Sequence, residues 1–196
     1  MGRPKAWLPF GRETMLQRVV RLVGLAAGVG PIAVVAAPGQ DLPPLPDHVT
    51  VVRDNVCGRG PLQGLAAGLA GLPDDVDLVY ASATDVPFLR PEWIDCLVAL
   101  IGDRDLAIPH VGGYHHPLAA VYRRATVSPA IEDLLRLDRL RPVFLMEAVR
   151  TRVVEADELR AADPELMTLR NLNSPDDYRA ALESLTEADR GDLAGG

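Results

Sequence analysis

Residues 78–89 read Leu-Val-Tyr-Ala-Ser-Ala-Thr-Asp-Val-Pro-Phe-Leu, and this stretch decides the fold. Its first four residues, 78–81, form a short apolar run that predicts a buried strand. Thr84 and Asp85 follow shortly after that strand. Because ligands of open α/β sheets bind beyond the carboxyl ends of the strands, Asp85 is a candidate binding residue. The alternative for such an acid is a purely structural turn or helix cap.

Other short apolar runs lie on both sides of this stretch and alternate with helical patterns. The predicted strands span 32–37, 49–52 and 106–109, and the predicted helices span 14–27, 61–69 and 91–101. Thr14 is placed to cap the first helix, and Pro61 is placed at the first position of the second. The alternation predicts an α/β fold with a mainly parallel sheet. Asp54 and Asn55 follow the second strand, so a second acid is expected at the same edge as Asp85.

The pattern changes after a turn at Gly112-Gly113. The next strand is predicted at 117–122 without a preceding helix, so it is expected to form an antiparallel hairpin with the strand at 106–109. Further helices are predicted at 128–137 and 143–149, a strand at 152–155, and a last helix capped by Ser174 with Pro175 at its first position. We expect a single domain over residues 1–185 and a frayed tail over residues 186–196.

Composition narrows the class of protein. The 196-residue chain carries a net charge of −7, which makes it a poor candidate for binding nucleic acid or an anionic membrane surface. Its most apolar stretch, residues 19–37, is interrupted by Arg21, glycines and Pro31 and is too broken to cross a membrane. Cys57 and Cys96 cannot build a disulfide framework and no secretory signal is recognisable, so we expect free thiols in the cytoplasm.

The basic residues are strongly biased. Of 20 basic side chains, 19 are arginines and Lys5 is the only lysine. A lysine retained in such a chain is a candidate for chemistry that needs a compact ammonium rather than a planar guanidinium, although chance retention near a terminus is an alternative. His115 and His116 are adjacent and would point to opposite faces of a strand, which disfavours a metal pair.

Several short motifs occur in an order and spacing typical of one enzyme family. They are Met1-Gly2-Arg3-Pro4-Lys5, Leu8-Pro9-Phe10-Gly11, Asp54, Gly60-Pro61-Leu62-Gln63-Gly64, Thr84-Asp85-Val86-Pro87-Phe88-Leu89, His116-Pro117-Leu118 and Asn171-Leu172-Asn173-Ser174-Pro175. Over nearly the whole chain they resemble the molybdenum cofactor guanylyltransferase family. The resemblance implies the nucleotide-diphospho-sugar transferase fold, which is a three-layer, Rossmann-like, mainly parallel sheet with an antiparallel hairpin in the C-terminal half.

The family's reaction, as the resemblance implies it, moves GMP from GTP to the terminal phosphate of molybdopterin and releases pyrophosphate. GTP and molybdopterin would be its partners, Mg²⁺ its cofactor, and molybdoenzymes or cofactor-insertion proteins the recipients of its product. Lys5 would reach the phosphates as a mobile charge, and Asp85 would hold Mg²⁺. The resemblance places Lys5, Asp54, Gly60, Pro61 and Asp85 at the nucleotide. It places four further residues on the pterin side: His116, Pro117, Asn171 and Asn173.

The sequence departs from this family's pattern at two places. Ala36 stands where the family carries an asparagine, so one polar contact to the nucleotide is missing or supplied elsewhere. The family also begins with a buried strand and a loop of the type Leu-Ala-Gly-Gly-x-Ser-x-Arg, whereas this chain begins at the following Met-Gly-x-x-Lys motif. Without such a strand, the strands at 32–37 and 78–81 would face a gap. We therefore expect marginal stability and weak or no activity.

Three other functions stay open at this point. The chain could be a cytidylyltransferase acting on the same pterin, a guanylyltransferase acting on another phosphorylated small molecule, or a non-catalytic binding protein that lacks the phosphate loop. Gly60-Pro61-Leu62 favours guanine.

Overall fold

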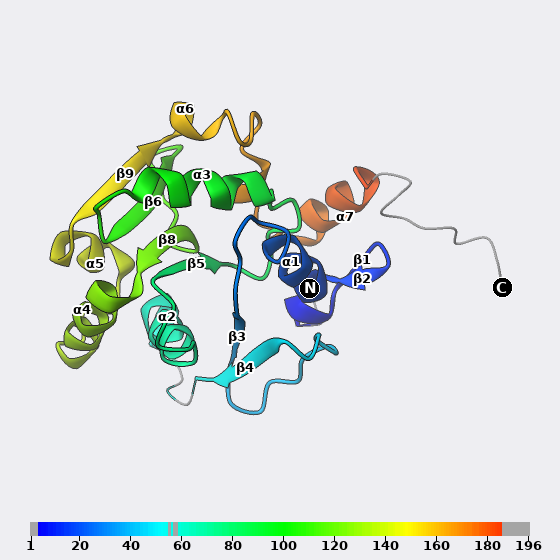
Figure 1. Ribbon diagram of the computed structural model, residues 1–196. Coiled ribbons are helices and arrows are strands. Elements are labelled where there is room, and N and C mark those ends of the chain that lie inside the picture. Colours follow the sequence, from blue (N-terminus) through cyan, green and yellow to red (C-terminus); the bar gives the residue numbers. More distant parts are fainter. Residues whose placement is uncertain (1–3, 55, 57–58, 186–196) are drawn as a thin grey trace.

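The strands of the computed structural model form two separate sheets and one small ribbon (Figure 1). The structure describes residues 4–54, 56 and 59–185, so residues 1–3 of the first motif, Asn55 and the tail expected over 186–196 lie outside the described residues. In the first sheet, β3 (Ile32–Ala36) pairs in parallel with β4 (Val49–Arg53). The ribbon consists of β1 (Pro9–Phe10) and β2 (Glu13–Thr14).

The second sheet has five strands, with β9 paired to β6 beside the path β5-β8-β6-β7. Its members are β5 (Leu78–Ser82), β6 (Leu106–Val111), β7 (Tyr114–His115), β8 (Ala119–Arg123) and β9 (Thr151–Glu155). Both β5 and β6 are antiparallel to β8, whereas β9 is parallel to β6. Therefore β5, β6 and β9 run in the same direction and β8 is the reversed strand. The predicted hairpin of β6 and β8 is confirmed, and so is the α/β fold class.

Helices cover both faces of the sheets. The described helices are α1 (Met15–Val23), α2 (Gly60–Ala70), α3 (Pro91–Ile101), α4 (Arg124–Arg136), α5 (Pro142–Ala148), α6 (Ala156–Leu159) and α7 (Pro175–Glu183), with 3-10 turns η1 (Lys5–Trp7) and η2 (Met167–Leu169). None of these helices combines the length and the apolar character that crossing a membrane requires.

Strand alternation sends side chains of β6 into two different cores. Leu106 and Ile108 pack with α2, α4 and α5, whereas Ala107 packs with α3 and α6 on the opposite face. The large buried residues of these cores include Tyr122 on the first face and Trp93 on the second. The five-stranded sheet is therefore the middle layer of a three-layer arrangement.

Helix α4 begins four residues earlier than predicted from the sequence. The prediction began at Ser128, but the helix in the structure begins at Arg124 and contains Pro129. Arg124 donates to one carbonyl in the last turn of α2, that of Leu69, and to two just beyond it, those of Leu72 and Pro73, at 2.8–3.1 Å. This tertiary anchor fixes the first turn of α4 and helps to offset the hydrogen bond that a proline inside a helix removes.

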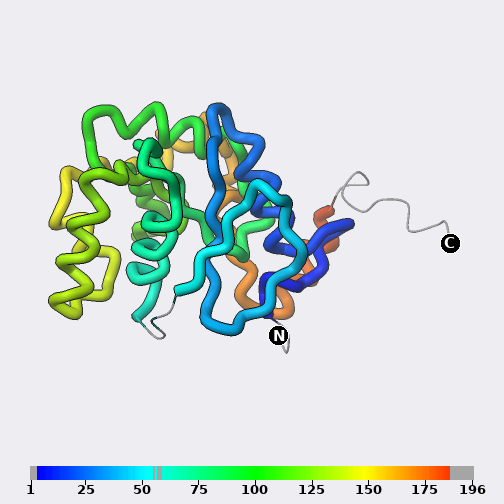
Figure 2. Tube along the Cα trace, turned by 60° about the horizontal axis from the view of Figure 1, so that its bottom comes forward, coloured from blue at the N-terminus to red at the C-terminus, as the bar shows by residue number. Residues whose placement is uncertain are grey.

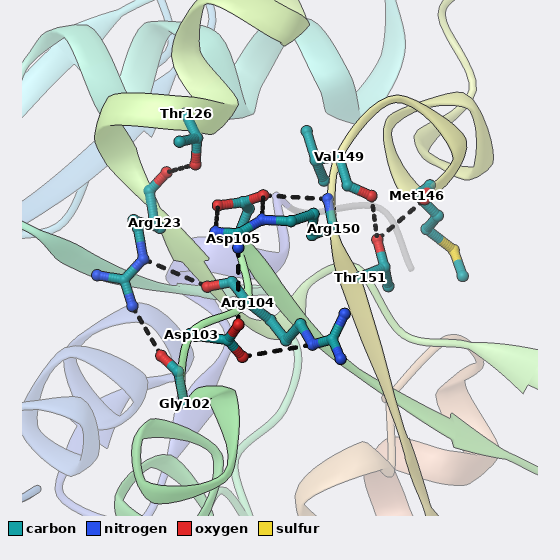
Figure 3. A network of polar contacts seen from close by, with 10 residues as sticks. All are labelled: Gly102, Asp103, Arg104, Asp105, Arg123, Thr126, Met146, Val149, Arg150 and Thr151. Carbon is teal, nitrogen blue, oxygen red and sulfur yellow. Dashed lines mark hydrogen bonds and ion pairs between the residues drawn. The ribbon is translucent and has the colours of Figure 1, made fainter.

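An ion pair between the buried Asp105 and the exposed Arg150 joins the amino-terminal ends of β6 and β9 (Figure 3). The carboxylate of Asp105 accepts hydrogen bonds from the backbone nitrogen, Nε and Nη2 of Arg150, each at 3.0–3.1 Å. These bonds lower the pKa of Asp105 from 3.8 to about 2, against the opposing effect of burial. The pair is a fixed part of the framework, because both carboxylate oxygens are engaged by one rigid guanidinium.

The sheet is split between β3 and β5. Among the described residues, β3 pairs with β4 and β5 pairs with β8, and no sheet pairing joins β3 to β5. Figure 2 shows β3 and β4 side by side, between α2 and the N-terminal elements. All five residues of β5 are only half-buried, although it lies in the middle of the molecule. The gap that the sequence predicts beside these two strands is confirmed.

The two ends of the described chain pack together. Leu8, Phe10 and Met15 form one apolar cluster with Leu172 and, from the last helix, Ala181. Figure 1 shows α7 next to the β1–β2 ribbon. This contact brings the segment before α7 close to η1, where Lys5 lies.

Candidate functional site

The carboxylate of Asp85 joins three distant parts of the chain. Lys5 Nζ donates to Asp85 Oδ2 at 2.5 Å, and Asn171 Nδ2 donates to Asp85 Oδ1 at 2.7 Å. Lys5 Nζ also donates to Asn173 Oδ1 at 2.8 Å. Four residues from three motifs that lie far apart in the sequence therefore form one cluster. The side chain of Lys5 is 37% exposed and that of Asp85 is 14% exposed, so the cluster borders solvent.

Local structure explains why each member of the cluster lies there. Asp85 follows β5, and Leu172 N donates to its backbone carbonyl at 3.0 Å. Lys5 begins η1, which is anchored where Ala6 packs among α1 and β3 residues. The two asparagines precede α7, whose Ser174 forms a capping box with Asp177. Hydrogen bonds from Ser174 lower the pKa of Asp177, which strengthens this cap at neutral pH.

A cleft of about 400 Å³ lies beside the cluster, and we call it the Asp85 cleft. It opens between the two sheets at the point where the sheet is split. Its lining residues are Lys5, Ala6, Leu16, Val34, Val35, Gln40, Leu42, Ser82, Ala83, Thr84, Asp85 and Leu118. One flexible cation and one carboxylate face the same space, so the cleft can attract an anionic ligand and also hold a cation.

A second cleft of about 330 Å³, the Asp54 cleft, lies at the ends of β3 and β4. It is lined by Val35, Ala36, Ala37, Pro38, Asp54, Val56, Arg59 and Gly60. Val35 lines both clefts, so they adjoin across the end of β3. Asp54 and Gly60, both candidates from the sequence, line this cleft, whereas Pro61, the second residue of α2, does not. Ala36, the position of the first departure expected from the sequence, also lines this cleft.

The four residues expected on the pterin side make two different sets of contacts. Asn171 and Asn173 join the Asp85 cluster, whereas the His116 ring contacts the carbonyl of Val111 at 3.3 Å. The carbonyl of Pro117 accepts from the hydroxyl of Tyr122 at 2.6 Å. Burial, with a smaller effect of neighbouring histidines, lowers the pKa of His116 and favours its neutral form. Of the His116-Pro117-Leu118 motif, Leu118 alone lines the Asp85 cleft.

Sequence reasoning missed three polar residues beside the clefts. Gln40 lines the Asp85 cleft and Arg59 lines the Asp54 cleft, while Arg53 donates to the carbonyl of Gln40 at 2.6 Å. Arg59 Nη2 also donates to Leu135 O at 2.5 Å. The position of Arg53 directly after a predicted strand could have indicated a residue near the ligand. Its contacts depend on the turn at Gln40, which the pattern of apolar residues does not predict.

Comparison with known proteins identifies the family. The model of the MobA-like NTP transferase domain matches residues 1–153. The chain belongs to this family. A relative from Mycobacterium tuberculosis, named a probable molybdenum cofactor guanylyltransferase, is 34% identical over 188 residues, and the alignment covers 93% of this chain and 87% of the relative. The predicted family is thereby confirmed, and this MobA-like NTP transferase is a nucleotidyltransferase similar to molybdenum cofactor guanylyltransferases.

Solved structures confirm the fold of this MobA-like NTP transferase. The molybdopterin-guanine dinucleotide biosynthesis protein A of Archaeoglobus fulgidus superposes with a TM-score of 0.72 at 20% identity, covering 93% of this chain and 90% of that one. The 2-C-methyl-D-erythritol 4-phosphate cytidylyltransferase of Thermus thermophilus superposes with a TM-score of 0.67 at 18% identity, covering 92% and 93%. At these identities the similarity establishes the fold only, so the preferred nucleotide has to be argued from the residues of the site.

Proposed function

We propose that this chain transfers GMP from GTP to the terminal phosphate of molybdopterin. An oxygen of the pterin phosphate attacks the α-phosphorus of GTP, a new phosphoanhydride bond forms, and the bond to the β-phosphate oxygen breaks to release pyrophosphate. The observation that carries this proposal is the cluster of Lys5, Asp85, Asn171 and Asn173 at the end of β5, beside a cleft that adjoins the Asp54 cleft. The name of the M. tuberculosis relative supports the choice of substrates.

The two clefts suit the two ends of a nucleoside triphosphate. The Asp85 cleft contains the flexible cation Lys5 and suits the phosphates, while the more apolar Asp54 cleft suits the base. A carboxylate can only accept hydrogen bonds, so Asp54 favours a base edge with adjacent N–H groups. Guanine offers such an edge at N1 and N2, and cytosine does not. Asp54 therefore supports GTP over CTP.

Asp85 is the residue that would hold Mg²⁺. Its carboxylate and the neighbouring amide oxygens are hard oxygen donors, and the ammonium of Lys5 on Asp85 Oδ2 indicates that a cation is favoured at this carboxylate. Among the described residues no group of three or more His, Cys, Asp or Glu side chains could hold a metal, so phosphate oxygens would complete the coordination. When bound, Mg²⁺ would neutralise charge on the triphosphate.

Lys5 and Asn171 would bind the phosphates and orient the carboxylate of Asp85, respectively. Lys5 carries its charge on a flexible stem, so its ammonium can follow the negative charge that develops on the leaving pyrophosphate. Asn171 holds one oxygen of Asp85 and thereby fixes the plane of the carboxylate. We also infer a cytoplasmic setting, where GTP is available and free thiols stay reduced.

Pyrophosphate release tests the proposal. The assay compares GTP, CTP and ATP with and without molybdopterin, using the unmodified chain, Asp85→Asn and the matched control Asp176→Asn. Asp176 is an exposed acid paired with Arg179 on α7 and lines neither cleft. We expect slow release that needs both GTP and molybdopterin, that Asp85→Asn lowers further and that Asp176→Asn leaves unchanged. Release with CTP in place of GTP would contradict guanylyl transfer.

One observation favours a second candidate, nucleotide binding without turnover. The sheet is split beside the Asp85 cleft, so the wall that faces the phosphates is incomplete between β3 and β5. A binding protein would bind GTP in equilibrium dialysis but release no pyrophosphate under any of the assay conditions. Turnover above the background of Asp85→Asn would exclude this candidate.

A further inference from the structure

Arg53, at the end of β4, uses its guanidinium to hold a turn of the neighbouring chain segment. Its Nη1 donates to Gln40 O at 2.6 Å and to Ala37 O at 3.3 Å. The same turn is closed from within, because Gln40 N donates to Ala37 O at 3.1 Å and Ala37 N donates to Gln40 Oε1 at 3.0 Å. Gly39 has a φ of +68°, which a Pro-Gly turn of this kind requires.

This turn, residues 37–40, separates the two clefts, and we call it the partition. Ala37 and Pro38 line the Asp54 cleft, whereas Gln40 lines the Asp85 cleft. Arg53 pairs with Ala36 in the β3–β4 register, so its side chain starts one residue away from the partition. The position of the partition therefore determines how far the two clefts lie from each other.

We propose that Arg53 is a positioning residue that fixes the partition and thereby sets which nucleotide is accepted. This inference rests on the proposed function. A triphosphate that reaches Lys5 leaves a defined space for its base beside Asp54, and a displaced partition would change that space. Arg53 would act through two carbonyls rather than on the ligand, because a rigid guanidinium aims two N–H groups at fixed points where an ammonium does not.

Amide exchange provides a test that does not depend on activity. In the chain without ligand, we compare exchange at Gln40 N in the unmodified protein, Arg53→Met, Arg53→Lys and the control Arg136→Met, which alters an exposed pair on α4. We expect exchange at Gln40 to rise roughly 10-fold or more in both Arg53 variants, since a charge-assisted hydrogen bond is lost, and to stay unchanged in the control. Unchanged exchange in Arg53→Met would overturn the proposal.

Nucleotide binding provides the second test, with dissociation constants for GTP, ATP and CTP from calorimetry. We expect Arg53→Met to weaken GTP binding roughly 10-fold and to reduce the preference for GTP over the other two nucleotides. Where turnover is measurable, KM should change more than kcat. Arg53→Lys should resemble Arg53→Met. Gln40→Ala, which removes the side-chain bond inside the turn, should reproduce part of the effect.

The outcomes separate the two hypotheses. If the unmodified chain binds no nucleotide, the proposed function fails, while exchange at Gln40 still decides whether Arg53 holds the partition. If Arg53→Lys restores GTP affinity while exchange at Gln40 stays fast, Arg53 acts as a charge on the ligand, and the positioning role is wrong.

Discussion

The ion pairs Asp105–Arg150 and Asp85–Lys5 lie at opposite ends of β6 and β5, two strands that run in the same direction on either side of β8, and differ in how completely each carboxylate is engaged. Asp105 precedes β6 and accepts three hydrogen bonds from a single arginine (Figure 3). Asp85 follows β5 and accepts one side-chain bond each from Lys5 and Asn171. The carboxylate of Asp105 is held on both oxygens by one guanidinium, whereas that of Asp85 is shared between a charged ammonium and a neutral amide.

The difference indicates which pair can exchange its partner. Replacing Arg150 would break a bidentate contact to a carboxylate that is almost fully buried. Lys5 is a single point contact on a flexible stem, and its side chain is 37% exposed. The ammonium can therefore leave Asp85 for a phosphate at little cost. We infer that the amino-terminal edge of the sheet holds the fold together while the carboxyl-terminal edge performs the chemistry.

The largest effect is expected from closing the split beside Asp85. A chain extended upstream of Met1 by about 15 residues, enough for one strand and a loop, should melt higher and turn over faster. The reason is that each buried unpaired backbone group costs roughly 1–3 kcal/mol, against a total stability of about 5–15 kcal/mol. Thermal melts and GTP-dependent pyrophosphate release of both forms provide the measurement. Equal melting and equal turnover would show that the open edges of β3 and β5 cost nothing.

The next effect is expected at Asp85 itself. In an active, extended chain, Asp85→Asn should lower turnover at least ~10²-fold, because an interaction with the charge of the transition state is removed. The melting temperature should change little. The oxygen of the new asparagine can still accept a hydrogen bond from Asn171, and the ammonium of Lys5 can be solvated by water. Steady-state kinetics and a thermal melt on the same sample measure both. Near-normal turnover would remove Asp85 from the mechanism.

Asp105→Asn should give the opposite result. We expect a loss of about 2 kcal/mol in the free energy of unfolding, the scale of a charge-assisted hydrogen bond, because Arg150 is 58% exposed and water can still solvate it. Turnover per folded molecule should stay within about twofold, since Asp105 lines neither cleft. Urea unfolding and kinetics at low temperature separate the two quantities. A large loss of turnover with unchanged stability would reverse the roles of the two pairs.

The same pair predicts a pH dependence. The pKa of Asp105 is lowered to about 2 in the folded chain by hydrogen bonds from Arg150, and it returns to about 3.8 on unfolding. Because the folded form binds the proton more weakly, the pair stabilises fully above pH ~4, and this contribution is lost as the pH falls towards 2. Urea unfolding of the unmodified chain and Asp105→Asn at several pH values should give curves that converge on acidification. A constant difference between them would contradict the shift.

Local signals predicted the framework and the two acids that line the clefts. Apolar runs place β3, β4 and β5 because a strand's burial depends on a few consecutive residues, and the acids after two of these strands line the two clefts. Contacts between distant segments were not predictable. Nothing local indicates that Asn171 would bond Asp85, 86 positions earlier. The start of α4 was missed for the same reason, because the anchor of Arg124 on α2 is tertiary.

Lys5→Arg tests the flexible side of the comparison with the smallest expected effect. Arginine keeps the charge and can form a bidentate pair with Asp85, so it should make the mobile pair resemble the fixed Asp105–Arg150 pair. In an active, extended chain we expect turnover to fall roughly 10-fold with little change in melting, because the guanidinium would stay on the carboxylate instead of following the phosphates. Lys5→Met serves as the control that removes the charge altogether and should lose more. If Lys5→Arg keeps normal kinetics while Lys5→Met does not, charge alone is required at this position, and the retention of a single lysine among nineteen arginines is a matter of composition.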